Sequence, residues 1–103
     1  MDHAKHDKTK VANEEFAAIF ALGVNFFSQG QYKKAQVIFS GLMALDATNE
    51  QASIAYGESL LMAGQVQKAL YHFIRAKKRF ASRAFEAGLL KANILLKRTG
   101  FNH

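Results

Sequence analysis

The chain has 103 residues, half of them hydrophobic and 12% aromatic, so it can bury one small core and is too short for several domains. It has no cysteine, which excludes a disulfide framework, thiolate chemistry and cysteine-based zinc sites. The absence of proline favours long helices with short turns, and the formal charge of +6 fits an acidic partner or simply a soluble basic surface.

The first ten residues, MDHAKHDKTK, are polar, carry charges of both signs and lack apolar periodicity. We therefore expect residues 1–12 to form a mobile polar tail and residues 13–100 to form the folded domain. His3 and His6 have no further metal ligands beside them, so no metal site is expected there.

The apolar run from Phe16 to Phe27 predicts a first helix that begins near Asn13, a good cap, and ends near Ser28. This run is apolar on nearly every side, so it needs cover on two faces. It is too short to span a bilayer. Lysines precede it, but Glu14 and Glu15 stand where a secretory signal is positively charged, and no cleavage site follows. We expect a soluble cytoplasmic protein.

Four more helices follow from the apolar spacing and the turn residues. We expect them to span Tyr32 to about Leu45, Thr48 to Ala63, Val66 to Phe80, and Ser82 to about Arg98. Thr48 and Gln51 have the spacing of a capping box at the start of the third helix. The chain is thus predicted to be all-α, with five antiparallel helices.

A 34-residue period organises the middle of the chain. The residues that recur at this spacing are Gly23 and Gly57, Gly30 and Gly64, Ala35 and Ala69, and Phe39 and Phe73. Gly23 and Gly57 lie inside apolar helices, where a glycine costs about 1 kcal/mol relative to alanine, so we expect a neighbouring helix to approach closely there. Gly30 and Gly64 are expected to end helices in the left-handed conformation.

This period, with small and aromatic residues at these places, is the signature of a tetratricopeptide array of paired helices. It predicts about two and a half TPR-like helix-turn-helix repeats in a short right-handed superhelix with a concave groove. The fifth helix stands where a third repeat would begin and is apolar on more than one side. We therefore expect the isolated chain to self-associate or to require a partner.

In such arrays the first helix of each pair lines the concave groove, and the register predicts which side chains face it. The residues expected to bind a partner are Phe20, Val24, Phe27, Ile54, Glu58, Leu61, Phe85 and Leu95. This groove is apolar with one charge, and it suits an apolar or amphipathic segment of another protein, bound as a helix or as an extended peptide. Alternatively, Phe20, Phe27 and Phe85 pack together as a closed core, although Glu58 would then need a buried partner.

The densest charge cluster consists of Arg75, Lys77, Lys78, Arg79 and Arg83. It can be a solvated outer face, a surface for an acidic protein, or a nucleic-acid contact, but no reading motif or base-stacking platform accompanies it. His72 has no carboxylate at helical spacing, and the sequence has no glycine-rich phosphate loop. We therefore expect no catalytic residues, no cofactor and no enzymatic activity.

The run from Leu22 to Leu70 resembles the core of the tetratricopeptide chaperones of bacterial type III secretion systems. The likeness rests on the Gly30-Gln31-Tyr32 turn, on the ending from Phe39 to Asp46 and on the second glycine pair, and it covers roughly residues 16–96. This chain departs from the translocator chaperones in being shorter and basic, and its size fits better with the smaller chaperones of the same systems.

The resemblance implies a cytoplasmic bacterial holdase. Its groove would cover an apolar segment of a secretion needle, translocator or export subunit that would otherwise polymerise, with a co-chaperone or a homodimer as further partners. The rival hypothesis is a structural adaptor subunit that forms a permanent homo- or hetero-oligomer through its wide apolar helix faces.

Overall fold

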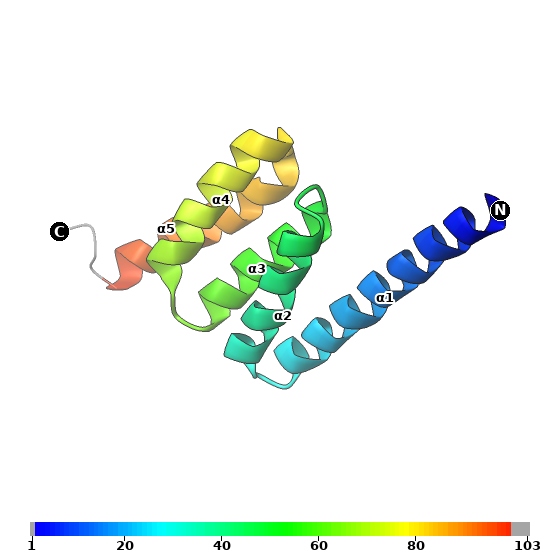
Figure 1. Cartoon of the computed structure of the whole chain (residues 1–103). Coiled ribbons are helices and arrows are strands. Elements are labelled where there is room, and N and C mark those ends of the chain that lie inside the picture. Colours follow the sequence, from blue (N-terminus) through cyan, green and yellow to red (C-terminus); the bar gives the residue numbers. More distant parts are fainter. Residues whose placement is uncertain (1, 100–103) are drawn as a thin grey trace.

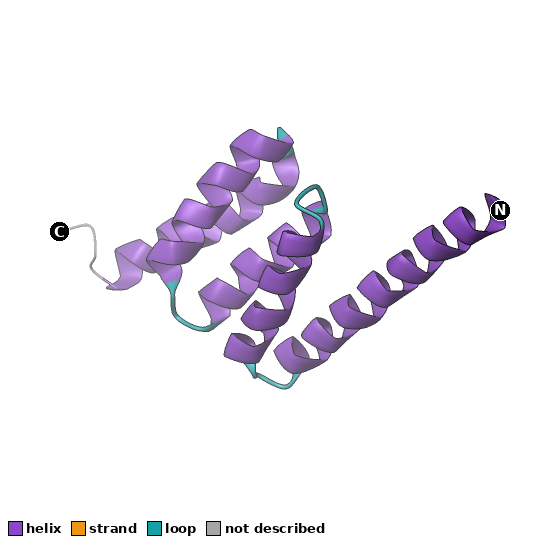
Figure 2. Cartoon of the chain, in the orientation of Figure 1, coloured by secondary structure: helices purple, strands orange, loops and turns teal. Residues whose placement is uncertain are grey.

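The computed structural model describes residues 2–99, with side-chain environments from residue 13 to residue 98, and in this range the regular elements are all helical. They are α1 (Asp2–Ser28), α2 (Tyr32–Leu45), α3 (Glu50–Met62), α4 (Val66–Phe80), a short 3-10 helix η1 (Arg83–Phe85) and α5 (Glu86–Thr99). Consecutive helices pack side by side, as two hairpins followed by α5 against α4, with short loops between them (Figures 1 and 2). The predicted all-α architecture of two and a half helix-pair repeats is confirmed.

The start of α1 differs from the prediction. The helix begins at Asp2 and not near Asn13, because residues 2–12 contain no glycine or proline and include alanine and lysine, which favour the helix. The N-terminal half of α1 extends away from the other helices (Figure 1). The described chain measures 62 × 31 × 16 Å, with a radius of gyration of 15.7 Å, against about 13 Å for a compact domain of this size. The mobility expected for residues 1–12 stays a prediction.

The interior glycines are contact points between helices, as predicted. A Cβ on Gly23 would lie 2.6 Å from Cε1 of Phe39, and a Cβ on Gly57 would overlap the ring of Phe73. Real Cβ atoms do not approach other atoms this closely, so any larger residue would push the helices of each hairpin apart. Both rings are almost fully buried, with 1% of their surface exposed.

The two turns within the hairpins use the left-handed conformation that favours glycine. Gly30 has φ of 77° and Gly64 has φ of 82°, which confirms their predicted role in ending α1 and α3.

The cap of α3 is Asn49 and not Thr48. The side-chain oxygen of Asn49 accepts a hydrogen bond from the Ala52 N–H at 2.9 Å. Thr48 is held elsewhere, because its N–H and its hydroxyl both donate to Oδ1 of Asp46. These two hydrogen bonds stabilise the ionised carboxylate and lower the pKa of Asp46. The predicted capping box is therefore wrong, because the cap of α3 lies one residue later than predicted.

The buried residues form two clusters, one centred on α2 and one on α4. The first cluster consists of Ala35, Phe39, Leu42 and Ala52. The second is larger and consists of Leu60, Leu61, Val66, Ala69, Phe73, Ala76, Phe85, Ala92 and Leu96. Since η1 contributes one member of the second cluster and α5 contributes two, the C-terminal half of the array is packed more completely than the N-terminal half.

Candidate protein-binding groove

The eight side chains predicted to bind a partner differ in how much surface they offer. Val24 is 42% exposed; Phe20, Phe27, Ile54, Glu58 and Leu95 are half-buried; Leu61 is 7% exposed and Phe85 has no exposed surface. The first six can therefore contact another molecule, whereas Leu61 and Phe85 lie in the core.

A hollow of about 130 Å³ lies between α1 and α3, and we call it the groove hollow. It is lined by Val24, Phe27, Phe39, Ala55 and Glu58. Three of these are residues that the 34-residue register placed in the groove, and Phe39 adds an aromatic wall. The hollow is apolar except at Glu58, so it can accept an uncharged side chain by burial.

A larger hollow of about 560 Å³ follows along α1 toward its N-terminus, and we call it the turn hollow. Its lining consists of Asn13, Glu15, Phe16, Ala17, Ile19 and Phe20 from α1, together with Leu45, Asp46, Asn49 and Gln51 from the end of α2 to the start of α3. Phe20 in this hollow and Val24 in the groove hollow are one helical turn apart. Together the two hollows follow the length of the face between α1 and α3.

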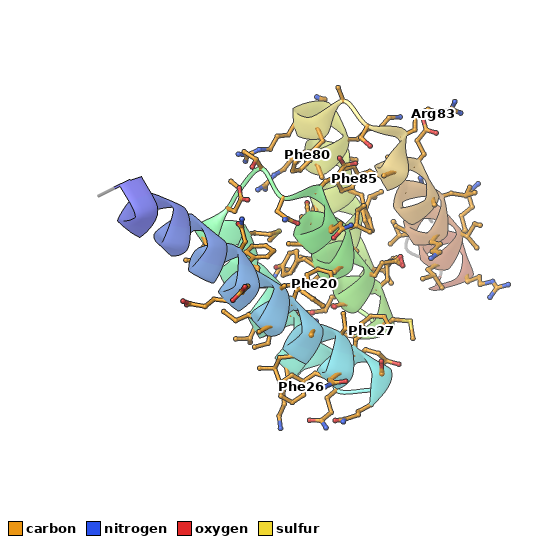
Figure 3. All side chains as sticks on the ribbon, turned by 90° about the vertical axis from the view of Figure 1, so that its right-hand side faces the viewer. Phe20, Phe26, Phe27, Phe80, Arg83 and Phe85 are labelled. Atoms are coloured by element: carbon orange, nitrogen blue, oxygen red, sulfur yellow. The ribbon has the colours of Figure 1, made fainter. Side chains whose placement is uncertain are left out.

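The three phenylalanines that were predicted to line the groove each pack on a different ring. Phe20 lies 5.4 Å from Phe39, Phe27 lies 5.2 Å from Tyr32, and Phe85 lies 5.4 Å from Phe80 in a stacked pair, all measured between ring centroids. Figure 3 shows Phe20 and Phe27 on the side of α1 that faces α3, with Phe26 on another side. The three rings considered for a closed core therefore do not interlock with one another.

The C-terminal part of the expected groove is closed, which corrects the prediction for Phe85. A Cβ on Gly88 would lie 2.5 Å from Cε1 of Phe73, so α5 approaches α4 closely at this glycine. Phe85 and Ala92 of the same segment are fully buried. The register placed these residues in the groove because it assumed that α5 stands as far from the preceding helices as α3 does.

The charge of Glu58 is balanced by a residue that the sequence reasoning missed. Nζ of Lys91 on α5 lies 3.0 and 3.1 Å from the two carboxylate oxygens of Glu58. Lys91 lies 34 residues after Gly57, where the period predicts another glycine. This departure from the glycine pattern was the sequence signal that could have pointed to Lys91. Because both side chains are partly exposed, the ion pair adds little stability, but it leaves the groove hollow without an unpaired charge.

The described side chains contain no group of three His, Cys, Asp or Glu residues that could hold a metal ion, and His3 and His6 lie outside them. Nor is any helix within residues 2–99 long and apolar enough to cross a membrane. The groove hollow between α1 and α3 exposes apolar surface.

Comparison with known proteins gives one match. A family profile described as tetratricopeptide repeat matches residues 26–94, about two thirds of the chain. The comparisons with curated proteins and with solved structures gave no match. The matched region runs from the end of α1 into α5, and it therefore includes the second hairpin and every turn described above.

Proposed function

The chain belongs to the tetratricopeptide repeat family, whose members are typically protein-interaction modules, and from this premise we propose that it binds one client protein as a chaperone. The client segment is apolar or amphipathic, and it lies along the face between α1 and α3.

The observation that carries this proposal is the pair of hollows beside α1. The groove hollow is apolar and is bordered by Val24, which leaves 42% of its surface in solvent although it is a large hydrophobic residue. The turn hollow, one helical turn further along α1, offers a second site for side chains of a bound segment. Exposed apolar surface of this kind marks a binding site or an aggregation risk.

The energetics require several anchors from the client. Burial of one leucine or phenylalanine side chain contributes roughly 1.5–3 kcal/mol, whereas association costs about 4–15 kcal/mol of translational and rotational freedom. A single anchor in the groove hollow would therefore not give stable binding. Three or four anchors, spaced along a helix or an extended strand, contribute roughly 4.5–12 kcal/mol, which is comparable with that cost.

We further propose that the chain is a holdase of a bacterial type III secretion system and works in the cytoplasm. Its client would be a needle, translocator or export subunit whose apolar segment polymerises when it is uncovered. The support for this assignment is the sequence resemblance described above, and the groove provides a place where such a segment can be shielded until export.

Substitutions in the groove test the proposal. We expect Phe27→Asp and Val24→Asp to abolish recovery of the client when the tagged chain is purified from its native cell, because a buried carboxylate without a partner opposes burial of an apolar anchor. Leu90→Asp is the matched control, since Leu90 is 63% exposed on α5, away from the groove. Leu61→Asp is unsuitable, because Leu61 lies in the core. Client recovery at the wild-type level by both groove variants would refute the proposal.

A structural adaptor subunit is the second candidate, and one observation favours it. Leu90 and Ile94, which are 63% and 45% exposed, lie one turn apart on α5, where the second helix of a third repeat would pack. Light scattering after size exclusion separates the two functions. The adaptor predicts that the wild type is a permanent oligomer without a client and that Leu90→Glu/Ile94→Glu dissociates it. The chaperone predicts that this variant still binds its client.

A further inference from the structure

A third hollow lies on the side of α2 and α4, opposite the groove, and we call it the arginine hollow. Its volume is about 190 Å³, and its lining includes Met43 from α2, Ser53 from α3, and His72, Arg75, Arg79 and Phe80 from α4. The proposed chaperone function makes no use of this face of the molecule.

Four residues of the basic cluster divide into two groups in the structure, and the fifth, Lys78, neither pairs with Glu86 nor lines the arginine hollow. Lys77 and Arg83 both pair with Glu86, at 3.8 Å and 3.4 Å respectively. Arg75 and Arg79, which border the arginine hollow, have no carboxylate within 4.0 Å among the described side chains. The positive charge that remains unpaired beside a concave surface is therefore concentrated at these two guanidinium groups.

The wall beneath the arginines is fixed and polar. Nε2 of His72 lies 2.7 Å from the carbonyl oxygen of Ser53, so this nitrogen carries the proton and donates it to the carbonyl. The ring also packs edge-on against Tyr56, with 4.9 Å between the centroids. Burial is the main cause that lowers the pKa of His72, and the charge of Arg75 lowers it further, so the imidazole is neutral at neutral pH.

We propose that the arginine hollow binds a carboxylate of an acidic protein segment that also carries apolar side chains. Arg75 and Arg79 are four residues apart on one helix, so their side chains lie on the same face. Each guanidinium can bind a carboxylate through two parallel hydrogen bonds. The apolar part of the lining, which includes Met43 and Phe80, would hold a neighbouring aliphatic side chain of the same segment.

The same observations argue against nucleic acid as the occupant. Affinity for nucleic acid comes from many phosphates along a basic track, and Glu86 neutralises the part of the cluster that would extend the track. Single-stranded binding also uses free aromatic faces. The ring of Phe80 is stacked on Phe85 and is approached by the guanidinium of Arg79 at 6.0 Å, so it is not free for a base.

A labelled peptide of alternating glutamate and leucine tests the proposal by fluorescence anisotropy with the full chain. We expect Arg75→Glu/Arg79→Glu to weaken binding at least about tenfold, since charge-assisted contacts are lost and replaced by repulsion. Lys33→Glu/Lys68→Glu changes the net charge equally and places acids in the first turns of α2 and α4, where they suit the helix dipole. This control should bind within about twofold of the wild type. The corresponding glutamine–leucine peptide should not bind.

Ring signals of His72 in nuclear magnetic resonance provide a second measurement on the wild-type chain, independent of how the variants fold. They should shift when the glutamate peptide is added. Equal loss in both double variants, unshifted His72 signals, or stronger displacement of the peptide by inorganic phosphate or by a single-stranded oligonucleotide would each overturn the proposal.

Discussion

At the residue scale, the array is held together by phenylalanine rings that rest on glycines. The ring of Phe73 lies against Gly57 on α3 and also against Gly88 on α5, so one side chain joins three helices. Phe39 has the corresponding contact with Gly23, but its other side borders the groove hollow. The phenylalanine-on-glycine contact therefore closes the core in the second hairpin and borders an open hollow in the first.

The contact between Gly57 and Phe73 predicts opposite effects for two glycine substitutions. Gly57→Ala should lower the free energy of unfolding by about 1–2 kcal/mol, because overpacking outweighs the gain in helix propensity. Gly41→Ala in α2 should raise it by about 0.5–1 kcal/mol, because a Cβ there meets no atom within 4 Å. Urea denaturation followed by circular dichroism measures both. A Gly57→Ala variant as stable as the wild type would show that α3 and α4 are not in close contact.

At the element scale, the helices that could be predicted from sequence are those bounded by turn residues with a steric reason to be there. Gly30 and Gly64 end α1 and α3 in the left-handed conformation, and the boundaries of α2 and α4 were predicted as observed. The start of α1 was not predicted, because the polarity of residues 2–12 was taken as a sign of disorder. These residues contain no helix breaker, so the helix continues through them. The cap at Asn49 was missed because the carboxylate of Asp46 accepts the hydrogen bonds of Thr48, a local contact in the turn before α3.

The groove was predicted in part for a related reason. A fixed period assumes that each helix pair stands at the same distance from the next one. Three of the side chains that it assigns to the groove from α1 and α3 do line the groove hollow. The assumption fails at α5, where Gly88 lies outside the 34-residue period and allows a closer approach to Phe73, which buries Phe85. Lys91 occupies the place where the period expects the next glycine, and it pairs with Glu58 instead.

The end of α4 carries a conformational cost that can be removed. Ala81 has φ of 49° and ψ of 43°, a left-handed conformation that costs a residue with a Cβ about 1–2 kcal/mol. Ala81→Gly should therefore stabilise the fold by about 0.5–1 kcal/mol, after the added chain entropy of the unfolded state is subtracted. Gly64→Ala, at φ of 82°, is the matched reverse change and should destabilise it. Thermal denaturation of the two variants checks this, and a lower melting temperature for Ala81→Gly would contradict the left-handed end of α4.

At the scale of the whole molecule, the two faces of the array differ in chemistry. The groove hollow is apolar and its carboxylate Glu58 pairs with Lys91, whereas Glu15 and Asp46 add polar surface at the turn hollow. The opposite face carries Arg75 and Arg79 beside a half-apolar hollow. The two proposals thus place an apolar segment on one side and an acidic segment on the other, and the two sets of lining residues do not overlap.

The most direct test of the central claim is photocrosslinking in the native cell. A photoreactive residue is substituted at Val24 in the groove hollow and, in a second chain, at Leu90 on α5. The groove proposal predicts that position 24 crosslinks to one client protein and that position 90 does not. Crosslinks to the same protein only from position 90, or from position 24 only to a second copy of this chain, would contradict it.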